Sequence, residues 1–326
     1  MTPLILAIPS KGRLMDQTRD YLADAGLSVR KTAGDRGYSA VLEGAAGIEL
    51  KLMSASAIAG ALGRGEVHLG VTGEDLLREL SPDLSGLHLV RALGFGRADL
   101  VVAAPKFWLD ARTLSDLDAL GAERFAASGR HLRIATKYHR LASAFLARKG
   151  VRRYRLIDSA GATEAAPAAG DADLIIDITT TGATLEANGL SPLTDGLILR
   201  SEAQLAASLA ADWSPRAQDA LKGFLLTLEA RARARQTRYV FCSGATPEAV
   251  EELIRAFDGQ IRRDGVVSVP AAQALGAARS LSQKSEAPAD IVSPDFIFEA
   301  TSNDYDEFLS AINEHTQIFT GSAPLE

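Results

Sequence analysis

Short apolar segments alternate with amphipathic segments along the first two thirds of this chain, and this alternation constrains its fold more than any other feature. The apolar runs "LILAIP" (4–9), "VHLGVTG" (67–73) and "LIIDITT" (174–180) are each followed by residues with helical spacing. Strands that are apolar on both faces are typical of parallel sheets covered by helices on each side. The pattern therefore predicts an α/β fold with mostly parallel sheets.

A hydroxyl-rich loop follows the run at 174–180. It consists of Thr179, Thr180, Thr181, Gly182, Ala183 and Thr184. We expect a helix to start near Leu185, and its first N–H groups, with the threonine hydroxyls, suit a bound phosphate. Gly182 permits close backbone approach, and Asp177, at the strand end, would lie beside the ligand. The alternative is a plain strand-to-helix turn with Thr184 as its N-cap.

Basic and polar residues follow several other predicted strands. Lys11 and Arg13 come directly after the first strand, where they would contact phosphates or form a solvated basic turn. Further candidates for lining a cleft are Thr72 and Gly73 at a second strand–helix junction, Lys137 and Tyr138 at a third, and Arg97 after "LGFG". At the second junction Thr72 and Gly73 could hold an anion or a base edge, and for Glu74, which follows them, the alternative is helix capping alone.

Charge and composition exclude several classes of function. The formal net charge of −6 argues against a nucleic-acid partner, because such proteins usually carry a basic face. The single cysteine, Cys242, allows no intrachain disulfide. No apolar run approaches the ~20 residues that span a bilayer, and no basic segment precedes the first apolar run. We therefore expect a cytoplasmic protein that binds neither nucleic acid nor membrane.

The threonine loop resembles the 5-phosphoribosyl-1-pyrophosphate loop of phosphoribosyltransferases, although many of those enzymes have two adjacent acids where this chain has Asp177 and Ile178. A narrower resemblance rests on several motifs in the same order. The segments "PSKGRL", "LGVTGEDLL", "LGFGRADLVVA", "RIATKYHRL" and "DITTTGATLEANGL" are similar to ATP phosphoribosyltransferase, the first enzyme of histidine biosynthesis. The resemblance covers about residues 4–200.

This resemblance implies a two-lobed, periplasmic-binding-protein-like (type II) core and a small C-terminal α+β domain. We expect residues 1–97 and 188–229 to form the first lobe and residues 98–187 the second. The crossovers would lie at 94–100, where two glycines permit a bend, and at 188–193. Residues 230–326 would form the C-terminal domain, with strand-like "YVFCSG" and "FIFEA" each followed by a helix.

The resemblance also implies the reaction, in which the phosphoribosyl group of 5-phosphoribosyl-1-pyrophosphate moves to N1 of ATP with release of pyrophosphate. Lys11, Arg13 and Asp177 are the expected catalytic residues. Glu164 and Asp75 become candidates through the family alone, and Glu164 with Asp177 would hold Mg²⁺. In segment 52–57 many relatives carry an Arg and an acid. Here Ser54 and Ser56 either contact the nucleotide or that contact is lost.

The family has two forms, and the sequence leaves the choice open. Short chains work with a separate synthetase-like regulatory subunit, whereas long chains carry a C-terminal domain that binds histidine as a feedback inhibitor. This chain has the length of the long form, but "MSASAI" (53–58) is closer to the short form. The domain would bind histidine or only build contacts of a homo-oligomer, a dimer or hexamer. A non-catalytic nucleotide-binding regulatory paralogue is the alternative function.

Overall fold

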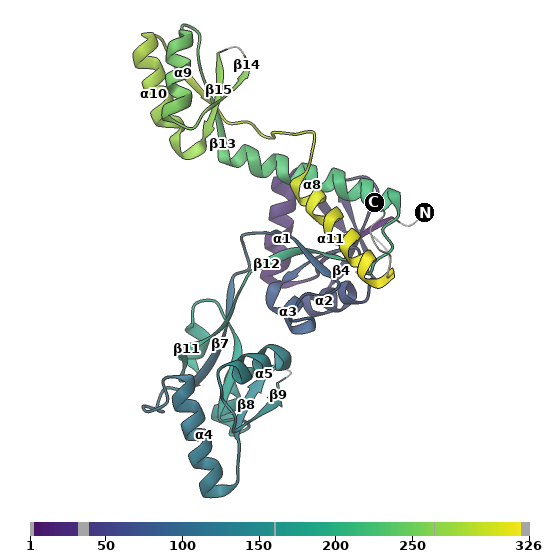
Figure 1. Cartoon of the computed structure of the whole chain (residues 1–326), viewed down its shortest axis with the longest axis vertical. Helices are drawn as coiled ribbons and strands as arrows, with labels where there is room; N and C mark the ends of the chain where they lie inside the picture. Colours follow the sequence, from purple (N-terminus) through teal and green to yellow (C-terminus); the bar gives the residue numbers. More distant parts are fainter. Residues whose placement is uncertain (1–2, 32–38, 160, 264, 321–326) are drawn as a thin grey trace.

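The protein, described by a computed structural model over residues 3–31, 39–159, 161–263 and 265–320, forms three bodies arranged end to end (Figure 1). The first lobe lies in the middle, the second lobe at one end and a small C-terminal domain at the other. Their strands form a seven-stranded, a five-stranded and a four-stranded sheet among the described residues.

The first lobe is built on a sheet of order β2-β3-β4-β1-β5-β12-β6. Its strands are β1 (Leu4–Pro9), β2 (Ser28–Lys31), β3 (Ser39–Glu43), β4 (Ile48–Met53), β5 (Leu69–Gly73), β6 (Leu87–Ala92) and β12 (Ala203–Ser208), and its helices are α1 (Gly12–Asp24), α2 (Ala55–Gly63), α3 (Glu74–Leu80), α8 (Pro215–Gln236) and α11 (Asn303–Thr320). Successive side chains of β1 point to opposite faces. Leu6 joins the core under α1, α8 and α11, whereas Ala7 joins the core under α2 and α3.

The second lobe has a sheet of order β11-β7-β10-β8-β9. Its elements are β7 (Ala98–Pro105), α4 (Leu114–Ser128), β8 (Leu132–Thr136), α5 (His139–Arg148), β9 (Tyr154–Asp158), η1 (Thr163–Ala165), α6 (Ala166–Ala169), β10 (Leu174–Thr179), α7 (Ala183–Ala187) and β11 (Leu190–Ser201). Leu100, Ile134 and Ile176 are fully buried, so the strands are apolar where helices cover them.

The two lobes share one strand order. The series β4-β1-β5-β12-β6 in the first corresponds to β9-β8-β10-β7-β11 in the second. This arrangement confirms the α/β fold with a two-lobed type II core. It also gives equivalent places to β5 and β10. The expected parallel pairing holds for the three strands β4-β1-β5 and β9-β8-β10, while the flanking pairings are antiparallel. The physical reason is that β7 and β12 each arrive from the other lobe and enter the sheet at the carboxyl ends of its parallel strands.

The second crossover differs from the expectation of 188–193. Strand β11 pairs with β7 from Leu190 opposite Pro105 to Ser201 opposite Ala98, so residues 190–201 lie in the second sheet. The chain returns to the first lobe only at Glu202, between β11 and β12. The first crossover lies between β6 and β7, at residues 93–97.

The C-terminal domain is smaller than residues 230–326. Its elements are β13 (Thr237–Cys242), α9 (Pro247–Ala256), β14 (Gln260–Arg263), β15 (Val266–Pro270), η2 (Ala271–Gln273), α10 (Ala274–Ser285) and β16 (Ala289–Val292). The order βαββαβ and the antiparallel sheet β14-β15-β13-β16 are ferredoxin-like. The "FIFEA" segment is not a strand.

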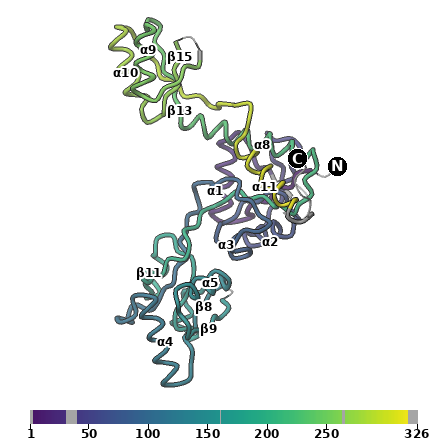
Figure 2. The backbone as a smooth tube through the Cα atoms, in the orientation of Figure 1, coloured from purple at the N-terminus to yellow at the C-terminus, as the bar shows by residue number. Residues whose placement is uncertain are grey.

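Helix α11 returns to the first lobe instead of completing the small domain, as the backbone trace shows (Figure 2). Phe308 is fully buried there, with its ring 4.5 Å from that of Trp213. Burial of this aromatic side chain explains why the chain returns along α8. The long helix α8 therefore belongs to the first lobe and carries the small domain at its C-terminal end (Figure 1).

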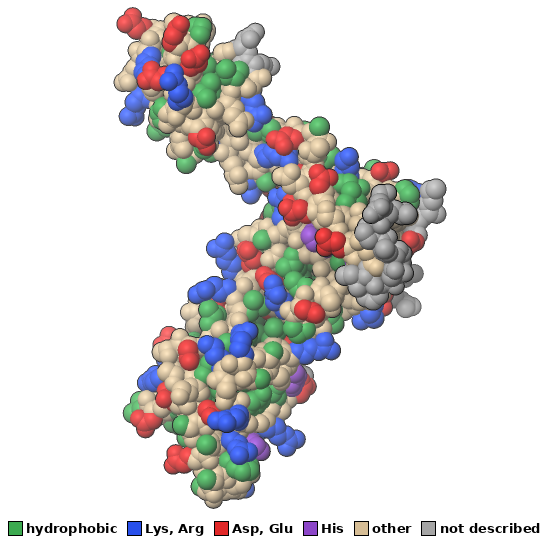
Figure 3. All heavy atoms as spheres, viewed as in Figure 1, with side chains coloured by type: hydrophobic (Ala, Val, Ile, Leu, Met, Phe, Trp, Pro, Cys, Tyr) green, Lys and Arg blue, Asp and Glu red, His purple; other side chains and the backbone are tan. Residues whose placement is uncertain are grey.

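Charged side chains of both signs are interspersed over all three bodies on the face that Figure 3 shows. None of the described helices combines the length and apolar character needed to cross a membrane.

Candidate active site

The carboxyl ends of the parallel strands bring the predicted site residues together. In the first lobe, β4 and β5 flank β1, so Lys11 and Arg13 after β1 lie next to the residues that follow β4. In the second lobe, β10 and β8 are neighbours, so Asp177 and the threonine loop lie next to Lys137. Ligands bind at this end of the strands in open α/β sheets. The crossovers join these two edges, and we call the space between the two edges the cleft.

A side-chain contact joins the basic turn of the first lobe to the threonine loop of the second. The Arg13 guanidinium donates from Nη2 to Thr180 Oγ1 at 3.5 Å, and both side chains are exposed. Lys11 is also exposed and is the residue directly before α1. The basic turn of the first lobe therefore faces the threonine loop of the second, where both can contact one anionic ligand.

The backbone of the threonine loop turns at Gly182 in the left-handed conformation that a glycine permits. Gly182 adopts φ +78°, and its N–H donates to Thr179 Oγ1 at 2.9 Å, whereas the Ala183 N–H donates to Thr181 Oγ1 at 3.4 Å. Helix α7 begins at Ala183 and has only five residues, with Gly182 and not Thr184 as its N-cap. A helix this short contributes little dipole, so a phosphate at this loop would depend on hydroxyls and loop N–H groups. The hydroxyl-bearing residues Thr180, Thr181 and Thr184 are exposed.

Asp177 lies near groups that have opposite effects on the pKa of its carboxyl. Burial raises its carboxyl pKa above the ordinary value, and the nearby Glu164 carboxylate adds to this rise. Lys137 and the hydroxyl of Thr163 favour the ionised form and lower the pKa. Glu164 and Asp177 are thus close enough to interact, as a shared cation or ribose hydroxyls would require. Two carboxylates joined by substrate oxygens suit Mg²⁺, which takes few ligands from protein.

Three predicted ligand contacts are instead buried within the protein. Thr72 is fully buried, and its hydroxyl donates to the Ala55 carbonyl at 2.9 Å. Tyr138, which is also fully buried, donates from its hydroxyl to Asp75 Oδ2 at 2.6 Å. Tyr138 and Asp75 come from different lobes, so this hydrogen bond joins the lobes and does not line the cleft surface. Burial, followed by the charge of Asp75, raises the pKa of Tyr138, which keeps its hydroxyl protonated as a donor.

Two further residues complete an interlobe clamp, the name we give to Asp75, Glu79, Tyr138 and Ser201. Ser201 donates from Oγ to Asp75 Oδ1 at 2.8 Å and accepts the Asp75 N–H at 3.0 Å. Glu79 accepts the N–H groups of Arg140 and Leu141, at 2.9 and 3.0 Å, and thereby caps α5 of the other lobe. The sequence around Glu79 and Ser201 does not point to these roles, because nothing local marks a glutamate or serine whose partner lies tens of residues away.

The remaining candidates lie at the first lobe's edge and at its crossovers. Ser54 caps α2 by accepting the Ala57 N–H at 3.3 Å, and its hydroxyl lies 3.4 Å from that of Ser56. Both serines are exposed near Lys11, where a nucleotide phosphate can reach them. Gly73 is the residue directly before α3. Arg97 is 78% exposed and lies 3.6 Å from Glu202 at the other crossover.

Comparisons with known proteins agree with this geometry. The family model described as HisG, ATP phosphoribosyltransferase, matches residues 54–229. ATP phosphoribosyltransferase of Caulobacter vibrioides (strain NA1000 / CB15N) is 49% identical over 314 residues, which cover 95% of this chain and 98% of the relative. The Bradyrhizobium diazoefficiens enzyme of that name is 44% identical over 91% of this chain and 94% of its own.

Among solved structures, the ATP phosphoribosyl transferase (HisG:HisZ) complex from Thermotoga maritima matches with a TM-score of 0.53. The identity is 25%, and the match covers 69% of this chain and 96% of that one. The sequence motifs, the facing strand ends and the near full-length relatives agree with one another. This chain belongs to the ATP phosphoribosyltransferase family, whose members act in histidine biosynthesis.

Proposed function

We propose that the chain transfers the phosphoribosyl group of 5-phosphoribosyl-1-pyrophosphate to N1 of ATP in the cleft between its lobes. The observation that carries this assignment is the contact of Arg13 with Thr180, which sets a cationic side chain against the threonine loop. Family membership indicates the reaction, and the contact between Arg13 and Thr180 supports the cleft as its location. The alternative of a non-catalytic paralogue is not favoured by relatives that carry the enzyme's name at 44–49% identity.

The threonine loop is the proposed seat of the donor's 5-phosphate, through the hydroxyls of Thr180, Thr181 and Thr184. Asp177 would accept the ribose hydroxyls beside it. Lys11 and Arg13 would then face the pyrophosphate and stabilise the charge that develops as it leaves. Adenine N1 is itself a nucleophile, so the protein's main task is to hold two anionic substrates in line.

Mg²⁺ is the proposed metal ion. Asp177 and Glu164 would hold it together with substrate oxygens, and a bound ion would neutralise pyrophosphate charge. Lys137, which lowers the pKa of Asp177, would keep that carboxylate ionised for this purpose.

For ATP, Ser54 and Ser56 are the proposed contacts in place of the Arg and acid of many relatives. Their hydroxyls lie at the start of α2, on the strand edge that also carries Lys11. Arg97 is proposed to reach the cleft from the crossover. The ferredoxin-like domain is proposed either to bind histidine as a feedback inhibitor or to build oligomer contacts. A synthetase-like partner, such as the HisZ named in the Thermotoga maritima complex, is the corresponding proposal for the short form.

The test is a spectrophotometric assay of phosphoribosyl-ATP formation with ATP, 5-phosphoribosyl-1-pyrophosphate, Mg²⁺ and pyrophosphatase. We expect turnover by the full chain and a fall in kcat of roughly a hundredfold in Arg13→Gln, because a transition-state contact is lost. Arg19→Gln is the matched control, since Arg19 is exposed on the same helix but lies further along it. The control should retain wild-type turnover.

Calorimetric titration with 5-phosphoribosyl-1-pyrophosphate distinguishes the possible causes of absent turnover. Absent turnover with donor binding intact would mean that the chain needs a partner subunit or is a regulatory paralogue. Absent donor binding would reject the cleft assignment. Histidine added to the active enzyme distinguishes the two proposals for the C-terminal domain.

A further inference from the structure

A polar pocket lies in the first lobe, away from the residues assigned to the cleft. It has a volume of about 230 Å³ and lies between α1, the end of β6 and the last turns of α8. Tyr21 and Asp24 of α1, with Ala25 directly after the helix, are at the opposite end of α1 from Arg13. At 1.5 Å per residue, the length of α1 sets the two ends roughly 18 Å apart. None of the residues assigned to the cleft lines this pocket.

The pocket wall carries more positive than negative charge. Arg91, Arg231 and Arg235 line it, whereas Asp24 is the carboxylate among its described lining residues. Arg231 binds both oxygens of Asp24, each at 2.9 Å, and this contact is the main reason that the pKa of Asp24 is lowered. Arg235 Nη2 lies 2.9 Å from the same carboxylate. Within the pocket lining, two guanidinium groups thus share one carboxylate, and outside the lining the charge of Asp295 acts on Arg231.

The positive charge of Arg91, on the other side of the pocket, is already neutralised by carboxylates that lie outside the pocket lining. Its partners are Asp304 at 2.6 Å and Glu229 at 3.7 Å, and neither lines the pocket. The surplus charge therefore belongs to the pair Arg231 and Arg235. Of these, Arg235 is the more accessible, with 58% of its side chain exposed against 26% for Arg231. Arg235 has further N–H donors for a ligand beyond the one directed at Asp24.

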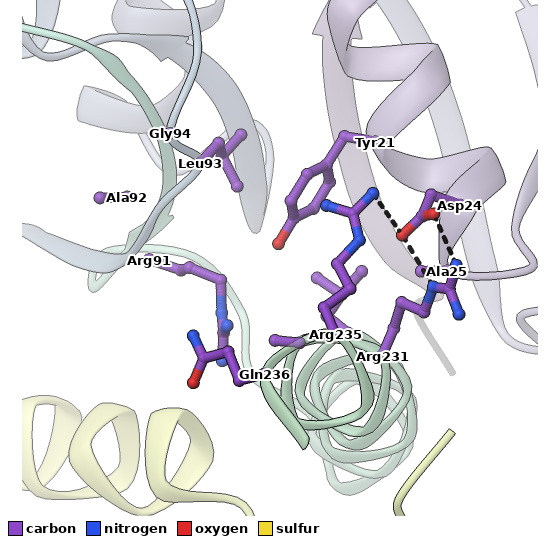
Figure 4. A pocket seen from close by; sticks show the side chains of 12 residues that line it. Tyr21, Asp24, Ala25, Arg91, Ala92, Leu93, Gly94, Arg231, Arg235 and Gln236 are labelled. Carbon is purple, nitrogen blue, oxygen red and sulfur yellow. Dashed lines mark hydrogen bonds and ion pairs between the residues drawn. The ribbon is translucent and has the colours of Figure 1, made fainter. Parts of the chain in front are cut away.

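Neutral donors and apolar atoms complete the lining. Figure 4 shows the side chains of Tyr21, Arg91, Arg235 and Gln236 extending into the space between α1 and the end of α8. Burial raises the pKa of Tyr21, so its hydroxyl stays protonated and can donate. Leu93, which is buried, supplies an apolar wall. A cavity with a few convergent polar groups over an apolar wall is typical of a small-molecule site.

We propose that this pocket binds a small metabolite bearing an oxyanion, a phosphate or a carboxylate, with Arg235 as the principal contact. The position suggests what such a ligand would do. Gly94, which lines the pocket, begins the crossover to the second lobe, and Gln236 is the last residue of α8 before the C-terminal domain. A ligand here contacts the joints through which both other bodies attach to the first lobe. It would therefore restrain their movement, as an effector does.

Calorimetric titration of the full-length chain with inorganic phosphate and, separately, with citrate tests the proposal at constant ionic strength. Arg235→Gln should weaken binding roughly tenfold or more, because a charge-assisted hydrogen bond is lost. Asp24 keeps its two bonds to Arg231, so this variant should fold. Arg216→Gln is the matched control, since it removes an exposed arginine from the other end of α8.

Phosphate would also bind the proposed site at the threonine loop. The variant Thr180→Ala distinguishes binding at that loop from binding in the pocket. Binding at the pocket survives Thr180→Ala and is weakened by Arg235→Gln, whereas binding in the cleft shows the reverse. Hydrogen exchange should slow in residues 91–94 and 231–236 when the anion is present. Loss of citrate binding alone, or phosphate binding alone, in Arg235→Gln would support the proposal and name the anion. Equal affinities of wild type and Arg235→Gln for both anions, or no binding at millimolar concentrations, would overturn it.

Discussion

Removal of one hydroxyl from the interlobe clamp should loosen the lobes without disturbing either core. Tyr138→Phe keeps the ring, which is fully buried in the second lobe, and deletes only the donor to Asp75 Oδ2. Asp75 is 6% exposed, so its carboxylate would lose a partner where water has little access. A hydrogen bond to a charged group contributes about 1.5–3 kcal/mol, and an unsatisfied buried acceptor costs a similar amount. We therefore expect the free energy of unfolding to fall by about 2 kcal/mol.

Urea denaturation is the assay, with tryptophan fluorescence as its signal. Trp213 lies in the first lobe and Trp108 in the second, so versions that retain one tryptophan report each lobe separately. Tyr154→Phe is the matched control, because Tyr154 lies on β9 of the same lobe and its hydroxyl bonds to none of the described residues. Its loss should cost less than about 0.5 kcal/mol.

Small-angle scattering gives a second readout. With the clamp weakened, the free protein should sample wider separations of the lobes, and its radius of gyration should rise. If Tyr138→Phe and Tyr154→Phe are equally stable and scatter alike, the hydrogen bond to Asp75 does not hold the lobes. A double-mutant cycle of Tyr138→Phe with Ser201→Ala should show coupling, since both hydroxyls donate to the same carboxylate.

Two further predictions concern the cleft. Gly182→Ala places a residue with a Cβ at φ +78°, so it should cost about 1 kcal/mol of stability and raise KM for 5-phosphoribosyl-1-pyrophosphate. Gly129→Ala, at φ +70° directly after α4, is the control. It should cost as much stability and leave KM unchanged. Equal KM values in both variants would contradict the proposed loop. Because the pKa of Asp177 is raised in the folded protein, its protonation should begin at a higher pH than for an exposed aspartate, so kcat/KM should fall as pH drops through this raised pKa. Because the pKa of Asp177 is higher in the folded protein than in the unfolded chain, the protonated carboxyl stabilises the folded state. This contribution to stability is lost as pH rises through the raised pKa. Lys137→Gln should move the acid limb to still higher pH, because Lys137 lowers the pKa of Asp177, whereas exposed Lys149→Gln should not; an unmoved limb would argue that Asp177 is not the titrating group.

Much of the site was predictable because parallel strands end at a common edge. A loop of threonines around Gly182 and a basic turn at Lys11 and Arg13 each follow an apolar strand, so their convergence needs only the α/β fold. Asp75 and Tyr138 follow strands in the same way, yet the structure buries both. The local sequence around a carboxylate is the same whether it faces ligand or protein, and only the partner, 63 residues away, decides between them.

The errors in domain boundaries have a similar cause. The segment "LSPLTDGLILR" contains proline, aspartate and glycine and looks like a crossover, but its register shifts and its pairing with β7 make it strand β11. Helix α11 has ordinary amphipathic spacing, which would suit either the small domain or the first lobe. Phe308 decides the matter by packing against Trp213.

The sequence by itself determined the α/β class, the strand-to-helix junctions and the hydroxyl-rich loop around Gly182. These follow from the period of apolar residues and from local backbone chemistry, which act over a few residues. Only the tertiary structure decided that Asp75 and Tyr138 join the lobes, that β11 stays in the second lobe and that Arg235 shares Asp24 with Arg231. Each of these depends on which distant segments meet, and the free energy of such a contact comes from burial and pairing that no local stretch of sequence contains.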